Sequence, residues 1–255
     1  MELTELFGTE KVGKILLRLA PPVMLAQLIQ ALYNIVDSLF VGKYADSGLT
    51  ALSIVYPLQL LMIALAVGTG VGVNTVMAAR LGIGRKKQAA EYAGVATPMA
   101  LVMWLAFAGI CWCIMPFYAR VSSQSPDVIR DVVTYGRIVC LCSTGLFLES
   151  VWTKVHQANG DMKTPMAAQI LGAVTNIVLD PLFIFALDMG VRGAALATVL
   201  SQAVSCVWVV TFLRGKQTLL RLEKASLPIR PRLILPCVAL GTATFIMQAS
   251  ESVIS

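Results

Sequence analysis

The chain has 255 residues, a formal net charge of +6 and a single histidine, and 57% of its residues are hydrophobic while only 13% are charged. Soluble domains carry roughly 45–50% apolar and about 25% charged residues, so this composition excludes an ordinary soluble domain. Apolar stretches of about 20 residues, the length that crosses a bilayer, recur along the chain. The sequence therefore predicts an all-α membrane protein.

Seven membrane-spanning helices are expected, because clusters of charged residues separate most of the apolar stretches. The N-terminal segment and every second loop hold 15 of the 20 Lys and Arg residues. Cytoplasmic loops are enriched in these residues, so the bias predicts a cytoplasmic N-terminus and reflects topology rather than a nucleic-acid partner. In chain order, the spans are predicted at residues 19–42, 51–78, 93–116, 132–153, 166–187, 193–213 and 234–255.

The chain divides at a basic stretch that ends in prolines. We expect residues 1–213 to form a six-helix transmembrane lobe, residues 214–233 to be a cytoplasmic linker, and residues 234–255 to be the first helix of an incomplete second lobe. The last helix carries polar residues that need a partner, so the chain is expected to be one part of a longer protein.

Cysteines and histidine give little support for a metal centre or another cofactor. All six cysteines fall in apolar stretches, where a thiol behaves as a small hydrophobic group. We therefore expect buried cysteines and no cofactor.

Three predicted helices each carry polar residues on one face. An ionised Asp at the centre of a membrane helix costs about 2.5–3.5 kcal/mol, so Asp37 and Asp180 are unlike ordinary packing residues. Asn176 lies one helical turn before Asp180, and Thr198 lies on the polar face of the sixth span. The other polar residues on these three faces are Gln30, Tyr33, Asn34, Gln169, Ser201, Gln202 and Ser205.

The polar residues on these faces are predicted to lie at similar depths in the bilayer, so the three faces can meet. Asp37, Asp180 and Thr198 each lie five to seven residues from the outer end of their predicted spans, which is roughly 8–10 Å below the outer surface. Two carboxylates in a low-dielectric cleft repel, so we expect one of them to hold a proton or a cation to lie between them. Neutral oxygens of Asn176 and Thr198 suit Na⁺ or H⁺. The uncharged polar residues on these faces have a second possible role, because amide and hydroxyl side chains commonly form hydrogen bonds that hold membrane helices together.

Two further features accompany this cluster. Pro21 and Pro22 lie near the start of the first span, where either ring removes a backbone donor and favours a bend. Glu149 lies near the cytoplasmic end of the fourth span, close in sequence to Lys154 and His156, and we expect an interfacial structural role for it.

Five segments in order, ALYNIVDSLFVGKY, LGIGRKKQAAEYAG, NGDMKTPM, TNIVLDPLFIF and GVRGAALATVLSQ, resemble the N-terminal lobe of multidrug and toxic compound extrusion (MATE) transporters. The likeness spans essentially the whole chain and is greatest to prokaryotic members of the DinF-like and MepA-like kind. It implies one six-helix lobe of a twelve-helix transporter, followed by the start of the seventh helix. It also implies export of cationic or amphipathic small molecules in exchange for H⁺ or Na⁺, from the plasma membrane, which in bacteria is the inner membrane.

Residues are assigned to roles by the same resemblance. The coupling-cation site matches Asp37, Asn176, Asp180 and Thr198, the bending proline matches Pro22, and the tyrosine that lines the lobe matches Tyr33. Other candidates for the lining of the cleft are Gln30, Asn34 and Gln202. The implied partners are the lipid bilayer, drug-like small molecules and a missing C-terminal lobe.

Three other functions are open to this sequence. A flippase for lipids or lipid-linked oligosaccharides would be expected to carry several cationic residues in its cleft, whereas the charges here are acidic. An intramembrane aspartyl protease would use Asp37 and Asp180, but neither follows a Gly-x-Gly pattern, so we expect no enzyme. A membrane fragment that does not transport is the third alternative.

Overall fold

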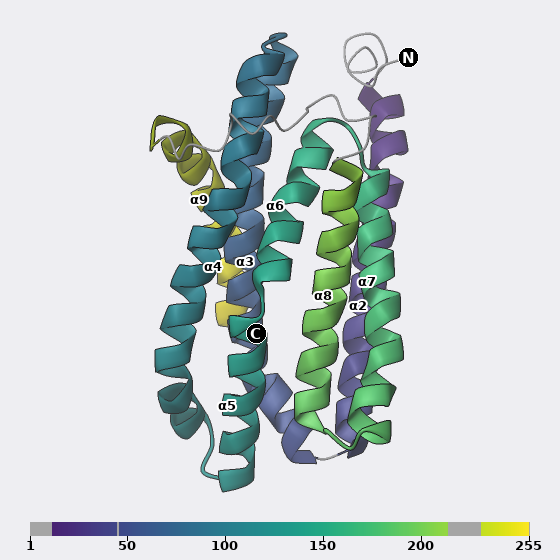
Figure 1. Ribbon diagram of the computed structural model, residues 1–255, viewed down its shortest axis with the longest axis vertical. Coiled ribbons are helices and arrows are strands. Elements are labelled where there is room, and N and C mark those ends of the chain that lie inside the picture. Colours follow the sequence, from purple (N-terminus) through teal and green to yellow (C-terminus); the bar gives the residue numbers. More distant parts are fainter. Residues whose placement is uncertain (1–11, 45, 214–230, 255) are drawn as a thin grey trace.

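The computed structural model describes residues 12–44, 46–213 and 231–254, and these residues form a bundle of long helices with short connections. Figure 1 shows the helices running side by side along the long axis of the molecule. No strand occurs within the described ranges. The elements are α2 (Val12–Tyr44), α3 (Asp46–Gly82), α4 (Lys86–Ser122), α5 (Pro126–Leu141), α6 (Thr144–Ala158), α7 (Lys163–Pro181), η1 (Leu182–Ala186), α8 (Val191–Leu213) and α9 (Pro231–Ile254).

The helices are long and apolar enough to cross a membrane at each place where the sequence predicts a span. Six helices qualify by length and composition, and the bent pair α5 and α6 adds a seventh span if the two are counted together. Most of the predicted linker, residues 214–230, lies outside the described residues, as does the N-terminal segment 1–11.

The fourth span is two helices, so the prediction of one helix over residues 132–153 was wrong. Helices α5 and α6 are bent by 45° at Cys142 and Ser143. The Ser143 hydroxyl donates to the Cys140 carbonyl at 2.8 Å, a local bond that competes with the helical backbone ladder. Gly145 then lets α6 approach α8 closely, because a Cβ there would lie 3.1 Å from the backbone nitrogen of Ala203.

The fifth span also changes its winding. Pro181 has no backbone N–H to donate, and the five residues of η1 that follow it form a π-helix. Asp180 is therefore held immediately before a change of helical geometry, a position often used for functional groups.

Helix α9 packs closely against α3. A Cβ on Gly72 would overlap the carbonyl oxygen of Cys237, and a Cβ on Gly241 would overlap that of Gly68. Small residues on both helices therefore let the two backbones touch, the usual way in which helices associate in membranes. The last helix thus has a partner in this chain, and its Gln248 lines the cavity described below.

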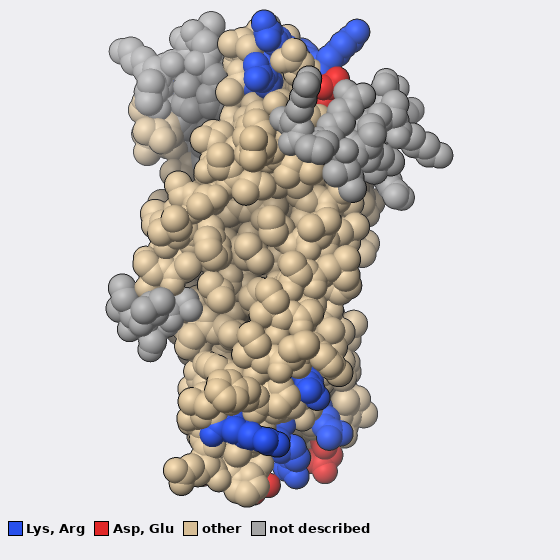
Figure 2. All heavy atoms as spheres, turned by 90° about the vertical axis from the view of Figure 1, so that its left-hand side faces the viewer, with Lys and Arg blue, Asp and Glu red and all other residues tan. Residues whose placement is uncertain are grey.

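The outer surface fits a bilayer. Figure 2 shows Lys and Arg side chains gathered at the two ends of one face, with a belt between them that shows no charged side chain. Large apolar side chains such as Leu17, Phe117 and Leu235 are mostly exposed. Contact with lipid would cover such side chains.

Candidate functional site

A polar cavity of about 670 Å³ lies between the helices of the bundle. Seven glutamines contribute to its lining, from α2, α3, α6, α7, α8 and α9. The predicted cleft residues all line it, as do two of the predicted cation ligands and the predicted bending proline: Gln30, Tyr33, Asn34, Gln202, Asp37, Thr198 and Pro22.

Helices α2 and α7 bring the two aspartates together. Asp180 is fully buried, Asn176 is 1% exposed and Asp37 is 9% exposed. The carboxyl groups of Asp37 and Asp180 interact directly, and the Asn176 side-chain amide donates to Asp180 Oδ1 at 3.4 Å. Among the described residues, Asp37 lines the cavity whereas Asn176 and Asp180 do not, so Asp37 lies between the cavity and the deeper pair.

Three oxygens of this cluster accept no hydrogen bond from the described residues: Asp37 Oδ1, Asn176 Oδ1 and Asp180 Oδ2. Buried polar atoms in proteins are nearly always paired, so three unpaired acceptors in one place leave room for a proton, a water molecule or a cation as their partner. Hard oxygen ligands of this kind fit Na⁺, and a shared proton fits the pair of carboxyl groups equally well.

Tyr135 lies between Thr198, the fourth predicted ligand, and the aspartate cluster. The sequence analysis did not single out this tyrosine. Its ring is 1% exposed, its hydroxyl accepts a bond from Gln59 Nε2 at 3.1 Å, and it contacts the Thr198 side chain. The signal in the sequence was a tyrosine on the apolar face of α5, at helical spacing from Val132 and Val139. A hydroxyl on such a face needs a polar partner.

Glu149 and Lys154 both line the cavity, so the expectation of an interfacial position for Glu149 was wrong. Glu149 Oε1 accepts a bond from Thr153 at 3.1 Å, and Lys154 Nζ donates to Gln157 Oε1 at 3.0 Å. The physical reason is the bend before α6, which gives this helix its own direction within the fourth span.

The predicted bend of the first helix stays a prediction. Helix α2 runs from Val12 to Tyr44 with Pro21 and Pro22 inside it.

Comparison with known families gives two matches. A family model described as MatE matches residues 22–182, and one described as Lipid II flippase MurJ matches residues 131–253.

Individual relatives agree with the first match. The chain is 25% identical to a protein of Shewanella oneidensis named FAD transporter, over 76% of this chain and 44% of that protein. It is 24% identical to the probable multidrug resistance protein YoeA of Bacillus subtilis, over 80% of this chain and 45% of that one. The chain thus spans about half the length of these relatives.

A solved structure has the same fold. The outward-facing form of a multidrug resistance MATE family transporter of the MOP superfamily superimposes with a TM-score of 0.89, at 27% identity, over 94% of this chain and 53% of that one. The MatE match covers more than half of the chain, and sequence and fold point the same way: the chain belongs to the MATE family of membrane transporters.

Proposed function

We propose that the chain carries the coupling-ion site of a multidrug efflux antiporter that exports cationic or amphipathic small molecules in exchange for H⁺ or Na⁺. The observation that carries this proposal is the set of three buried, unpaired acceptor oxygens on Asp37, Asn176 and Asp180. Such a set is stable when a cation neutralises it, and intramembrane carboxylates mark ion pathways by default.

Each residue has a physical role in this proposal. Asp37 and Asp180 bind the ion or share the proton. Asn176 donates a hydrogen bond to Asp180 from one helical turn away. Thr198 completes the site next to Tyr135. Loss of the ion would leave two carboxylates facing each other, and their repulsion would push α2 away from α7. Pro22 supplies the bend in α2 through which that movement reaches the cavity.

The cavity would take the cargo. Gln30, Tyr33, Asn34 and Gln202 offer hydrogen bonds and an aromatic face, and Asp37 and Glu149 offer negative charge. A cationic amphipathic molecule fits such a surface. YoeA, by its name a multidrug resistance protein, supports the same cargo class. Because the chain spans about half of such relatives, we infer that a second lobe closes the cavity.

A lipid flippase is the second candidate, favoured by the match of the MurJ family model to residues 131–253. A pyrophosphate-bearing lipid would need several cations in the cavity. Lys154 is the single Lys or Arg among the described residues that line it, against the acidic Asp37 and Glu149. The charge of the cavity therefore supports cationic cargo.

Substitution of Asp180 tests the ion site. The purified chain in lipid nanodiscs is titrated with ²²Na⁺ at several pH values, and efflux of a fluorescent cation is followed in cells that express the protein together with its second lobe. We expect Asp180→Asn to abolish saturable Na⁺ binding, or pH-dependent efflux if the ion is H⁺, with membrane insertion unchanged. The matched control is Asp127→Asn, since Asp127 is an exposed acid that pairs with Arg130. Unchanged binding and unchanged efflux in Asp180→Asn would contradict the proposal.

A further inference from the structure

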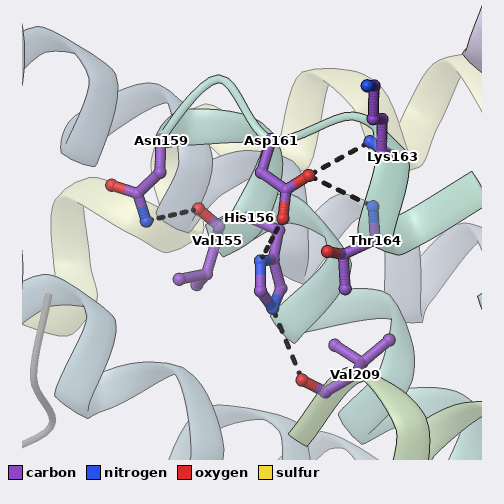
Figure 3. Close-up of polar contacts among 7 residues, drawn as sticks. All are labelled: Val155, His156, Asn159, Asp161, Lys163, Thr164 and Val209. Carbon is purple, nitrogen blue, oxygen red and sulfur yellow. Dashed lines mark hydrogen bonds and ion pairs between the residues drawn. The ribbon is translucent and has the colours of Figure 1, made fainter. Parts of the chain in front are cut away.

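The turn between α6 and α7 holds the one histidine of the sequence in a contact that joins three helices. Figure 3 shows the His156 ring between the Asp161 carboxylate of the turn and the backbone carbonyl of Val209 on α8. Its Nδ1 lies 3.1 Å from Asp161 Oδ2, and its Nε2 lies 3.4 Å from the Val209 oxygen. The side chain is 2% exposed, so water cannot take the place of either partner.

Both ring nitrogens of His156 therefore face oxygen atoms that accept hydrogen bonds. A neutral imidazole carries one N–H, and its other nitrogen is an acceptor. In the neutral form, one of the two contacts would bring two lone pairs together. The doubly protonated ring donates to both oxygens, so the geometry fits the imidazolium form.

Asp161 is tied into the same contact from its other oxygen. Asp161 Oδ1 accepts bonds from the backbone N–H groups of Lys163 and Thr164, each at 3.1 Å, and so caps the start of α7. Burial by itself would raise the pKa of Asp161, but the hydrogen bonds from His156 and Thr164 outweigh it and lower the pKa to about 2. This carboxylate is therefore ionised and able to hold a cationic ring.

The ends of the helices favour the same charge state. His156 lies in the last turn of α6, and Val209 lies near the C-terminal end of α8, where the helix dipoles are negative. Asp161 lies at the N-terminal end of α7, where the dipole is positive. A positive ring and a negative carboxylate are thus each placed where the backbone stabilises them.

Other charged groups lie farther from the ring. Helices α3, α4, α7 and α8 pack against α6, and Asp161 is the acid in contact with the imidazole among the described residues. Lys163 contributes its backbone N–H to Asp161, and its side chain points away from the ring in Figure 3. On α6 itself the charged residues are Glu149 and Lys154. The other charged or titratable groups that the packed helices bring to this end are Arg80, Lys86, Lys87, Glu91, Tyr92 and Cys206.

We propose that protonated His156 is a pH-dependent latch that fastens the turn between α6 and α7 to the end of α8. When the ring loses a proton, the remaining N–H stays with Asp161, because a carboxylate is the stronger acceptor. The unprotonated Nε2 then faces the Val209 carbonyl, and α8 is released. This latch is independent of the proposed ion site and stands whether or not Asp37 and Asp180 bind a cation.

Release of the latch would reach the cavity through α6. Helix α6 also carries Glu149 and Lys154, both of which line the cavity. The backbone carbonyl of Lys154 also accepts a bond from the Asn74 side chain of α3 at 2.7 Å. A shift of the end of α6 relative to α8 therefore moves charged groups of the cavity, which gives pH a second route to the transport path.

Nitrogen NMR of the histidine tests the latch directly. The chain is labelled with ¹⁵N-histidine, purified with a tag that contains no histidine and placed in lipid nanodiscs, so that the spectrum reports His156 alone. We expect two proton-bearing ring nitrogens at about pH 6 and one at about pH 9, the range around which histidine changes charge. Over the same range, hydrogen exchange at the amides near the end of α8 should become several-fold faster. A neutral ring at about pH 6 would overturn the proposal, and this result needs no variant to fold.

Variants separate the latch from a merely structural histidine. Asp161→Asn removes the carboxylate that accepts from the ring, so at a given pH the ratio of doubly to singly protonated ring should fall several-fold. His156→Gln should give fast exchange at the end of α8 at every pH. The control Asn159→Ala changes the same turn but removes a side chain that bonds only to the Val155 carbonyl among the described residues. An unchanged ratio in Asp161→Asn, or pH-dependent exchange that survives in His156→Gln, would also overturn the proposal.

Discussion

The Asn176 side-chain amide lies 3.4 Å from Asp180 Oδ1, one helical turn along α7, and donates a hydrogen bond to a carboxyl group that no solvent reaches. Asn176→Ala removes this donor and leaves the buried group less well paired, which costs about 1–3 kcal/mol. We expect a lower free energy of unfolding, measured by thermal unfolding in detergent, and weaker binding of the coupling ion. In the double variant Asn176→Ala/Asp180→Asn the two losses should not add, because the same bond is removed once.

The neighbouring Thr175 provides the control for this variant. Its hydroxyl donates to the Leu171 carbonyl of its own helix at 2.7 Å, so Thr175→Ala should change stability by less than about 0.5 kcal/mol. An Asn176→Ala protein as stable as Thr175→Ala would contradict the structural role of the amide.

The contact between α3 and α9 depends on Gly72. A Cβ at this position overlaps the Cys237 carbonyl oxygen, so Gly72→Ala should force the two helices apart and lower the melting temperature. Gly109 is the matched control, because a Cβ there meets no atom within 4 Å. Gly109→Ala should leave stability unchanged or raise it by up to about 1 kcal/mol, since Ala favours a helix more than Gly does. Equal effects of the two substitutions would show that α9 does not pack as described.

Stability should depend on pH through Asp161. Its pKa of about 2 in the folded chain lies below the ordinary value near 3.9, so the ionised form stabilises the fold. This contribution is complete above about pH 4 and is lost as the pH falls through about 2, because the unfolded chain takes up the proton first. The difference in melting temperature between the wild type and Asp161→Asn should therefore shrink as the pH falls from about 5 to about 2.

The exposed Asp127 controls for a general effect of acid. Its carboxylate is 73% exposed and pairs with Arg130 at 3.6 Å, so Asp127→Asn should stay close to the wild type at every pH. A difference for Asp161→Asn that does not change with pH would assign the effect to the lost side-chain geometry rather than to the charge.

Tyr135 is expected to hold the side of the ion site formed by Thr198. Tyr135→Phe removes the hydroxyl that accepts from Gln59 and contacts Thr198, so both side chains lose a partner. We expect a loss of about 1 kcal/mol in stability together with weaker ion binding. Tyr56→Phe is the control, since Tyr56 lines the same cavity but is 46% exposed. Equal ion affinity in the two variants would remove Tyr135 from the site.

The sequence by itself determined the membrane class and the positions of the spans. Apolar length and the cost of a charge in lipid are local properties, so the bilayer imposes them on each segment separately. For the same reason Asp37 and Asp180 stand out in the sequence itself, and helical periodicity together with depth places them near each other. The resemblance to MATE transporters rests on the same local segments, and the comparison of the whole chain agrees with it.

Only the tertiary structure decided which helices touch and where each span breaks. The contacts of Gly72 with α9 and of Gly145 with α8 depend on neighbours that are distant in sequence. The bend at Ser143 and the π-helix after Pro181 start from local features, a hydroxyl bonded to the carbonyl three residues before it and a missing backbone donor, which are also compatible with a continuous helix. Tyr135 also depends on distant neighbours, because its hydroxyl is paired with Gln59 and Thr198 on two other helices. A lone histidine forms no pattern, so the sequence shows His156 only as a neighbour of Glu149. Packing of α6 against α8 and the turn is what places both of its ring nitrogens against acceptors.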